Sequence, residues 1–100
     1  MKKKFSFGKI AFYGKRKINE VVLTVEYDEY GRFSVCGDVW NSRHTDIVCG
    51  GQCLDTLLPY FIDNELFMTI YRLWKDYHFA FPHKDTITKE DMETINKLLA

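Results

Sequence analysis

Residues 47–54 read IVCGGQCL, and the pattern of apolar residues changes across this octapeptide. Before it, apolar and polar residues alternate, which is typical of β-strands. After it, apolar residues recur about every 3.6 positions, which is typical of helices. Gly50 and Gly51 lie at the change, where a chain that reverses direction needs the dihedral freedom of glycine. The sequence therefore predicts an α+β fold, with strands over about residues 5–49 and helices over about residues 52–100.

The alternation is clearest over residues 18–27, where four positions are predicted to face inward: Val21, Leu23, Val25 and Tyr27. Residues 28–31 form a turn, in which Gly31 supplies the positive φ that a short hairpin requires. Residues 32–40 return as the partner strand and place three side chains on the face opposite the core: Cys36, Asp38 and Trp40. With a strand near residue 5 and a short one at 47–49, we expect three to four antiparallel strands.

The second half contains the signals of two to three helices packed on one face of this sheet. The first helix runs from about residue 52 to 60, where Pro59 is expected to kink or end it. The second has Asp63 as N-cap and Ile62 with Phe67 as a hydrophobic staple. Its predicted apolar stripe is Leu66, Ile70, Leu73 and Tyr77.

The third helix has Thr88 as N-cap and Ile87 with Met92 as its staple. The buried face of this helix is predicted to be Met92, Ile95, Leu98 and Leu99. A chain of 100 residues, of which 46% are apolar, is large enough for one core, so we expect a single domain over residues 1–100.

Charge is unevenly distributed, although the net charge is zero. Residues 1–17 hold seven basic side chains and no acidic one, and a phase slip at Gly8-Lys9 predicts a β-bulge among them. Lysines on an edge strand discourage pairing with other chains. The same lysines, interleaved with Phe5 and Phe7, would also suit nucleic acid, because aromatic side chains stack on bases while lysines hold phosphates.

Three cysteines are present, an odd number, and the basic start is followed by too short an apolar run to form a secretion signal. No apolar run is long enough to span a membrane, so a cytoplasmic protein with free thiols is expected.

Cys53, near a helix start with His44 or His78 as base, is the candidate nucleophile. Cys49 and Cys53 are the candidate metal ligands, and the side chains available to complete the site are Cys36, His44, His78 and His83. Neither spacing matches an established signature, so the prediction is a non-enzymatic protein without metal or cofactor. The thiols are expected to fill the interior, and His78 to end its helix beside Trp74 and the terminal carbonyl groups.

Two binding surfaces are predicted instead. The first, suited to a protein partner, lies on the outer face of the central hairpin and comprises Glu26, Asp38, Trp40 and Arg43. The alternative, suited to nucleic acid, is a basic N-terminal surface comprising Lys2, Lys3, Lys4, Arg16 and Lys17.

Three segments carry a resemblance to a known family: FSVCGDVWNS at 33–42, TDIVCGGQCLD at 45–55 and IYRLWKDYH at 70–78. Together they resemble a family of small uncharacterised proteins carried by phages, plasmids and conjugative elements of bacteria. The resemblance covers about residues 17–78, and the chain departs from the family at 79–83, which read FAFPH. It implies a mobile-element accessory protein that acts by binding a host or defence protein.

Overall fold

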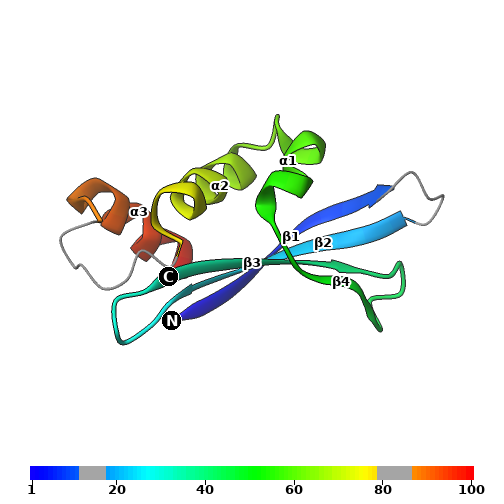
Figure 1. The fold of residues 1–100 in the computed structure, drawn as a ribbon, viewed down its shortest axis with the longest axis horizontal. Helices are drawn as coiled ribbons and strands as arrows, with labels where there is room; N and C mark the ends of the chain where they lie inside the picture. The colour runs from blue at the N-terminus through cyan, green and yellow to red at the C-terminus, as the bar shows by residue number, and fades with distance from the viewer. Residues whose placement is uncertain (12–17, 79–86) are drawn as a thin grey trace.

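The computed structural model describes residues 1–11, 18–78 and 87–100, in which an antiparallel sheet precedes three helices (Figure 1). The strands pair in the order β1-β2-β3-β4, so each lies beside its neighbour in the chain. Their bounds are Lys2–Ala11 for β1, Ile18–Tyr27 for β2, Phe33–Trp40 for β3 and Ile47–Gln52 for β4. The helices are α1 (Leu54–Phe61), α2 (Glu65–Tyr77) and α3 (Lys89–Leu99). The predicted α+β class and the four-strand upper estimate are confirmed.

The β2–β3 hairpin forms as the sequence predicts. Its register runs from Tyr27 opposite Phe33 to Glu20 opposite Trp40 without a slip. Gly31 has a φ of +81°, the left-handed conformation expected in this turn. The Asp28 carboxylate accepts from the Tyr30 and Arg32 amides, each at 2.9 Å, so one side chain satisfies the turn's backbone donors.

The predicted bulge in β1 is also present. The register against β2 shifts between Ser6 and Lys9, and Gly8 has a φ of +84°. Phe5 and Ile10, on either side of the shift, both pack against the core. The bulge thus restores the inward phase that strict alternation would lose.

The glycine pair is not the junction between sheet and helix, as the sequence led us to expect. β4 continues through both glycines to Gln52, which pairs with Gly37, and α1 begins only at Leu54. The Gly51 amide donates to Asp38 Oδ1 at 2.9 Å, and Gly51 has a φ of +63°. The register against β3 shifts twice along β4. The glycines therefore form an irregular edge strand, and the chain turns toward the helix at Cys53.

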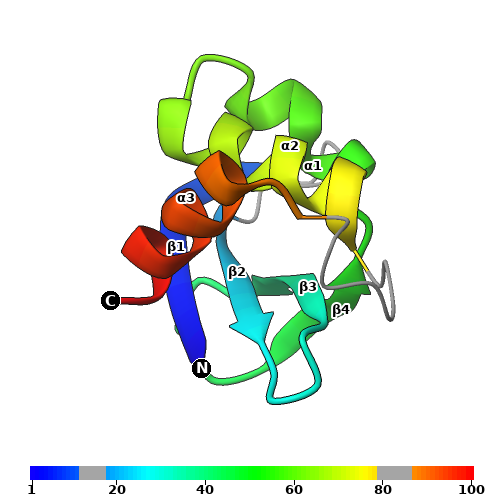
Figure 2. The same cartoon turned by 90° about the vertical axis from the view of Figure 1, so that its left-hand side faces the viewer.

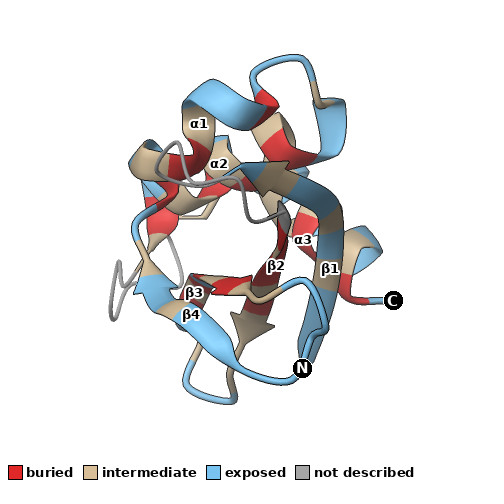
Figure 3. Ribbon diagram, turned by 90° about the vertical axis from the view of Figure 1, so that its right-hand side faces the viewer, coloured by how far each residue is buried: buried red, intermediate tan, exposed pale blue. Residues whose placement is uncertain are grey.

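The core lies between one face of the sheet and the helices, which all lie on the same side (Figures 1 and 2). Buried positions follow that interface in Figure 3. Of the four positions predicted to face inward, Val21, Leu23 and Val25 are fully buried, whereas Tyr27 is half-buried. Val22 has the opposite parity to these four positions and is nevertheless buried, with 7% of its surface exposed.

The start of α2 differs from the prediction by one residue. Asn64, not Asp63, is the N-cap, and its side chain accepts from the Phe67 amide at 2.9 Å. The proposed staple is therefore wrong, and Ile62 is exposed. The buried stripe contains Phe67 in place of Leu66, followed by the predicted Ile70, Leu73 and Tyr77. α1 ends at Phe61, two residues after Pro59, as expected for a helix that contains proline.

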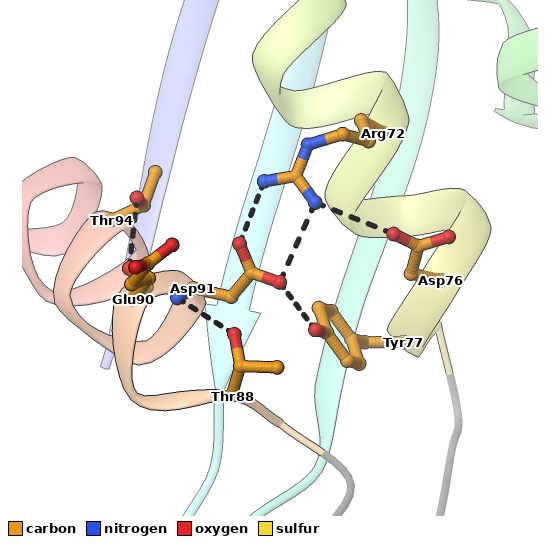
Figure 4. Close-up of polar contacts among 7 residues, drawn as sticks. All are labelled: Arg72, Asp76, Tyr77, Thr88, Glu90, Asp91 and Thr94. Atoms are coloured by element: carbon orange, nitrogen blue, oxygen red, sulfur yellow. Dashed lines mark hydrogen bonds and ion pairs between the residues drawn. The ribbon is translucent and has the colours of Figure 1, made fainter.

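The predicted cap of α3 is confirmed, because Thr88 Oγ1 accepts from the Asp91 amide at 3.2 Å. The Asp91 carboxylate then joins α3 to α2 (Figure 4). It accepts from Arg72 Nη2 at 2.8 Å and from the Tyr77 hydroxyl. The Arg72 and Tyr77 hydrogen bonds lower the pKa of Asp91 from 3.8 to about 2. A charged clamp therefore holds the third helix, whose Ile95 and Leu99 are buried in the core.

Candidate interaction surface

The outer face of the sheet, opposite the helices, carries none of the described helices (Figure 1). Its side chains come from alternate positions of β1, β2 and β3. A shallow concavity of about 290 Å³ lies on this outer face and is lined by Lys2, Lys4, Thr24, Glu26, Ser34, Cys36 and Asp38. The concavity is formed by cross-strand rows, in which Lys2 is opposite Glu26, and Glu26 is opposite Ser34.

Three of the four residues predicted for a protein partner lie on this outer face. Asp38 lies within the concavity, Glu26 at one end of the β2–β3 ladder and Trp40 at the other. Glu26 and Trp40 are separated by six steps along β2, or roughly 20 Å at the rise of a strand. Arg43 is exposed in the β3–β4 turn that follows Trp40. The predicted set thus spans the length of the face rather than one small site.

Trp40 has a partner that the sequence did not indicate. Its ring stacks on His44 with a centroid distance of 4.5 Å and an interplanar angle of 12°. His44 Nε2 is 3.3 Å from a Glu20 carboxylate oxygen, and Glu20 also accepts from the Ser6 hydroxyl. His44 has a φ of +58°, a conformation that the stack on Trp40 and the contact with Glu20 hold in place. The predicted exposed indole is therefore half-buried beneath an imidazole.

The basic residues proposed for nucleic acid do not form a separate surface. Lys2 and Lys4 lie on the same outer face as Glu26, whereas Lys3 extends to the Ala100 carbonyl oxygen at 3.1 Å. Arg16 and Lys17 lie outside the described residues. Lys9 is opposite Glu20 across the β1–β2 ladder. Basic and acidic side chains therefore alternate across one face.

The expectation that the thiols fill the interior is wrong. Cys36 and Cys53 are exposed and Cys49 is half-buried, and all three are free. Cys36 is exposed because it shares the outer parity of Asp38. In the described parts of the chain, no group of three or more His, Cys, Asp or Glu residues is placed to hold a metal ion. His83, one of the predicted ligands, is not among the described residues.

Cys53 is at the start of α1, as predicted for the candidate nucleophile. Its Sγ donates to Asp55 Oδ2 at 3.7 Å, and the same carboxylate accepts from the Tyr71 hydroxyl. The Tyr71 hydrogen bond lowers the pKa of Asp55, and the pKa of Tyr71 is raised. Of the two imidazoles predicted as the base for Cys53, His44 contacts Glu20 and His78 accepts from the Val35 amide.

His78 is the C-cap of α2, which confirms its predicted place at the helix end, and its ring packs against Trp74 at a centroid distance of 5.8 Å. Its Nδ1 accepts from the Val35 amide at 3.2 Å, so the ring joins α2 to β3. Burial lowers the pKa of His78. An imidazole nitrogen that accepts a hydrogen bond carries no proton, so the ring is neutral. His78 therefore does not act as a cation beside the helix carbonyl groups.

Comparisons of the chain with family models, curated proteins and solved structures find no match. Among the described residues, no helix has both the length and the apolar composition needed to cross a membrane.

Proposed function

We propose that this chain is a non-enzymatic binding protein that contacts a protein partner through the outer face of its sheet. The observation that carries the proposal is the alternation of charge on an uncovered face. Lys2 and Lys4 alternate with Glu26 and Asp38 around one concavity. Such a pattern complements a protein surface that itself carries both signs, and it fixes the orientation of the two partners.

Nucleic acid is the alternative partner, supported by Lys2 and Lys4 on the open face. A polyanion is attracted by unbalanced positive charge. Here Lys2 is opposite Glu26 and Lys9 is opposite Glu20. Side chains directly opposite each other on adjacent strands are closer than the roughly 8 Å over which charges interact at physiological salt. The acids offset the lysines, so the face favours a protein over a phosphate backbone.

A finer part of the proposal concerns the biological setting. The resemblance of residues 17–78 to proteins of phages, plasmids and conjugative elements suggests an accessory protein that binds a host or defence component. Three free thiols are typical of the reducing bacterial cytoplasm, where we place it.

Partner capture from a bacterial lysate tests the protein-binding proposal. The immobilised chain is compared with Lys4→Glu and Glu26→Lys, which reverse charges on the outer face, and with Glu93→Lys, a matched reversal at an exposed position of α3. We expect one protein, identified by mass spectrometry, to be retained by the wild type and Glu93→Lys and lost by both outer-face variants. Equal retention by all four chains would contradict the proposal.

A salt titration tests the alternative. Labelled single-stranded and duplex oligonucleotides are added at low and at physiological salt, because phosphate contacts weaken steeply as salt rises. The protein-binding proposal predicts no salt-sensitive binding. Tight binding at low salt that Lys4→Glu abolishes would instead support the nucleic-acid alternative.

A further inference from the structure

The turn between α1 and α2 exposes three large apolar side chains. Tyr60 is 43% exposed, Ile62 62% and Leu66 40%. Sequence patterns assigned Ile62 and Leu66 to the interior, yet α2 buries Phe67 in place of Leu66. Figure 3 shows this turn exposed at the end of the molecule remote from β3 and β4. Three large apolar residues within seven positions form a larger patch than isolated exposed residues would.

The surface is hollowed on both sides of this turn. A depression of about 580 Å³ is lined by Asp63, Asn64, Glu65, Leu66 and Thr69. A second, of about 320 Å³, is lined by residues 59–64. The two depressions share Asp63 and Asn64, so they lie next to each other on the turn. We call this surface, with Tyr60, Ile62, Asp63, Glu65 and Leu66, the turn patch.

Both charged side chains of the turn patch are acidic, and they lie beside the N-terminus of α2, which contributes partial positive charge. Asp63 and Glu65 are its only ionisable side chains apart from the Tyr60 phenol, and neither depression is lined by a basic residue. α1 has no basic residue in its last turn, so its C-terminal carbonyl groups add partial negative charge. The Asn64 side-chain oxygen accepts from the Phe67 amide. A ligand that combines cationic groups, to pair with the two carboxylates, with an apolar group therefore complements this surface.

We propose that the turn patch docks a basic segment of a partner protein that presents apolar side chains between lysines or arginines. Ile62 and Leu66 receive the apolar side chains, while Asp63 and Glu65 receive the cationic groups. The turn lies between helices that cover the opposite side of the sheet from the outer face (Figure 1). The turn patch is thus a second contact surface, independent of the one proposed above.

The charge also excludes other occupants. A phosphate backbone or an anionic membrane surface would be repelled by two carboxylates with no compensating base. A second copy of the chain has four of its seven described lysines on β1, where Lys2 and Lys9 are already opposite acids of β2, and the light-scattering experiment below tests this occupant directly. Charge complementarity therefore favours a basic partner segment.

Three fluorescein-labelled twelve-residue peptides test the proposal by fluorescence anisotropy. One has lysine and leucine at helical spacing, the second replaces every lysine with glutamate, and the third replaces every leucine with serine. We expect the lysine–leucine peptide to bind and the other two to bind at least tenfold more weakly. Equal binding of the lysine–serine peptide would overturn the apolar part of the proposal, and no binding of the lysine–leucine peptide would overturn it entirely.

Variants locate the binding. Combined Asp63→Asn and Glu65→Gln remove charge without changing size, and Ile62→Ser removes an exposed apolar group outside both helices. Each of these changes should weaken binding of the lysine–leucine peptide about tenfold. Glu93→Lys and Tyr30→Ser change equally exposed positions elsewhere and should bind as the wild type does.

Unchanged affinity in the Asp63 and Glu65 double variant would refute the site. Light scattering completes the test, since a concentration-dependent dimer that the same substitutions abolish would identify a second copy as the occupant and overturn the proposal. Because Lys4→Glu and Glu26→Lys leave the turn patch intact, failure of this proposal is distinguishable from failure of the proposed function.

Discussion

Replacing Asp91 with asparagine should destabilise the protein by removing the charged contact between α2 and α3. The carboxylate has its pKa lowered from 3.8 to about 2 by Arg72 and Tyr77. At about 1.4 kcal/mol per pKa unit, this shift corresponds to roughly 2.5 kcal/mol in the absence of screening. The Asp91 side chain is 15% exposed and that of Arg72 51%, so solvent screening reduces the expected loss to about 1–2 kcal/mol at pH 7.

The pH dependence distinguishes charge from mere packing. Because the pKa of Asp91 is lower in the folded than in the unfolded state, its stabilisation is fully present above pH 3.8 and is lost as the pH falls through about 2. The free energy of unfolding, measured by urea titration with circular dichroism at pH 7, 4, 3 and 2, should therefore converge between wild type and Asp91→Asn at the acidic end. A difference that stays constant from pH 7 to pH 2 would refute the electrostatic explanation.

Asp76→Asn is the matched control. Asp76 is 3.3 Å from Arg72 on the same helix, and both side chains are 51% exposed. An exposed pair of this kind contributes about 0.3–0.5 kcal/mol. If Asp76→Asn were as destabilising as Asp91→Asn, the clamp between the two helices would not be the source of the effect.

Three further changes test the packing and the caps. Because burial lowers the pKa of His78, stability should fall as the pH drops below 6.5, and His78→Asn, which keeps an acceptor, should remove this dependence in unfolding measurements at pH 7.5 and 5.5. Gly37→Ala should lower the free energy of unfolding by about 1–3 kcal/mol, because a Cβ there would lie 3.0–3.2 Å from three atoms. Gly50→Ala is the control: its Cβ would make ordinary contacts at 3.4 Å, so its unfolding midpoint should barely move. Asn64→Ala should cost about 1 kcal/mol in thermal unfolding and Asp63→Ala only a few tenths; the reverse order would restore the cap predicted from sequence.

The hairpin of β2 and β3 could be predicted because every local signal agrees. The period of two over residues 18–27, the Asp28 turn and the glycine at position 31 all specify one register. The α3 cap was predictable for the same reason, since Thr88 is followed at the right spacing by Asp91 and Met92. Where local preferences compete, sequence reasoning failed.

Two adjacent capping residues illustrate that failure. Asp63 and Asn64 are equally good N-caps, and the choice between them rotates the whole face of α2. Packing of Phe67 against Phe7 and Phe61, with ring centroids 5.5 and 5.0 Å away, selects Asn64. That tertiary contact leaves Leu66 exposed, so the turn patch had no local signal in the sequence.

The prediction for the glycine pair was wrong for a different reason, because the residues that hold this segment lie on β3, far away in the sequence. Gly51 is held by the Asp38 side chain, and Gln52 pairs with Gly37. A glycine doublet read without its cross-strand neighbours suggests a hinge, whereas the strand pairing makes it a bulged edge. The exposure of Cys36 was implied by its outward parity but was overridden by the general tendency of cysteine to be buried.

The two surfaces proposed here differ in what the fold alone already explains. Pairs such as Lys2 with Glu26 stabilise adjacent strands by a few tenths of a kcal/mol each, so a charged outer face is expected even without a partner. The apolar residues have no such explanation. Ile47, paired with Trp40 on the outer face, is 48% exposed, and Ile62 in the turn patch is 62% exposed. The charges should therefore fix the orientation of a partner while the apolar positions add contact area, so substitutions of either kind should weaken binding.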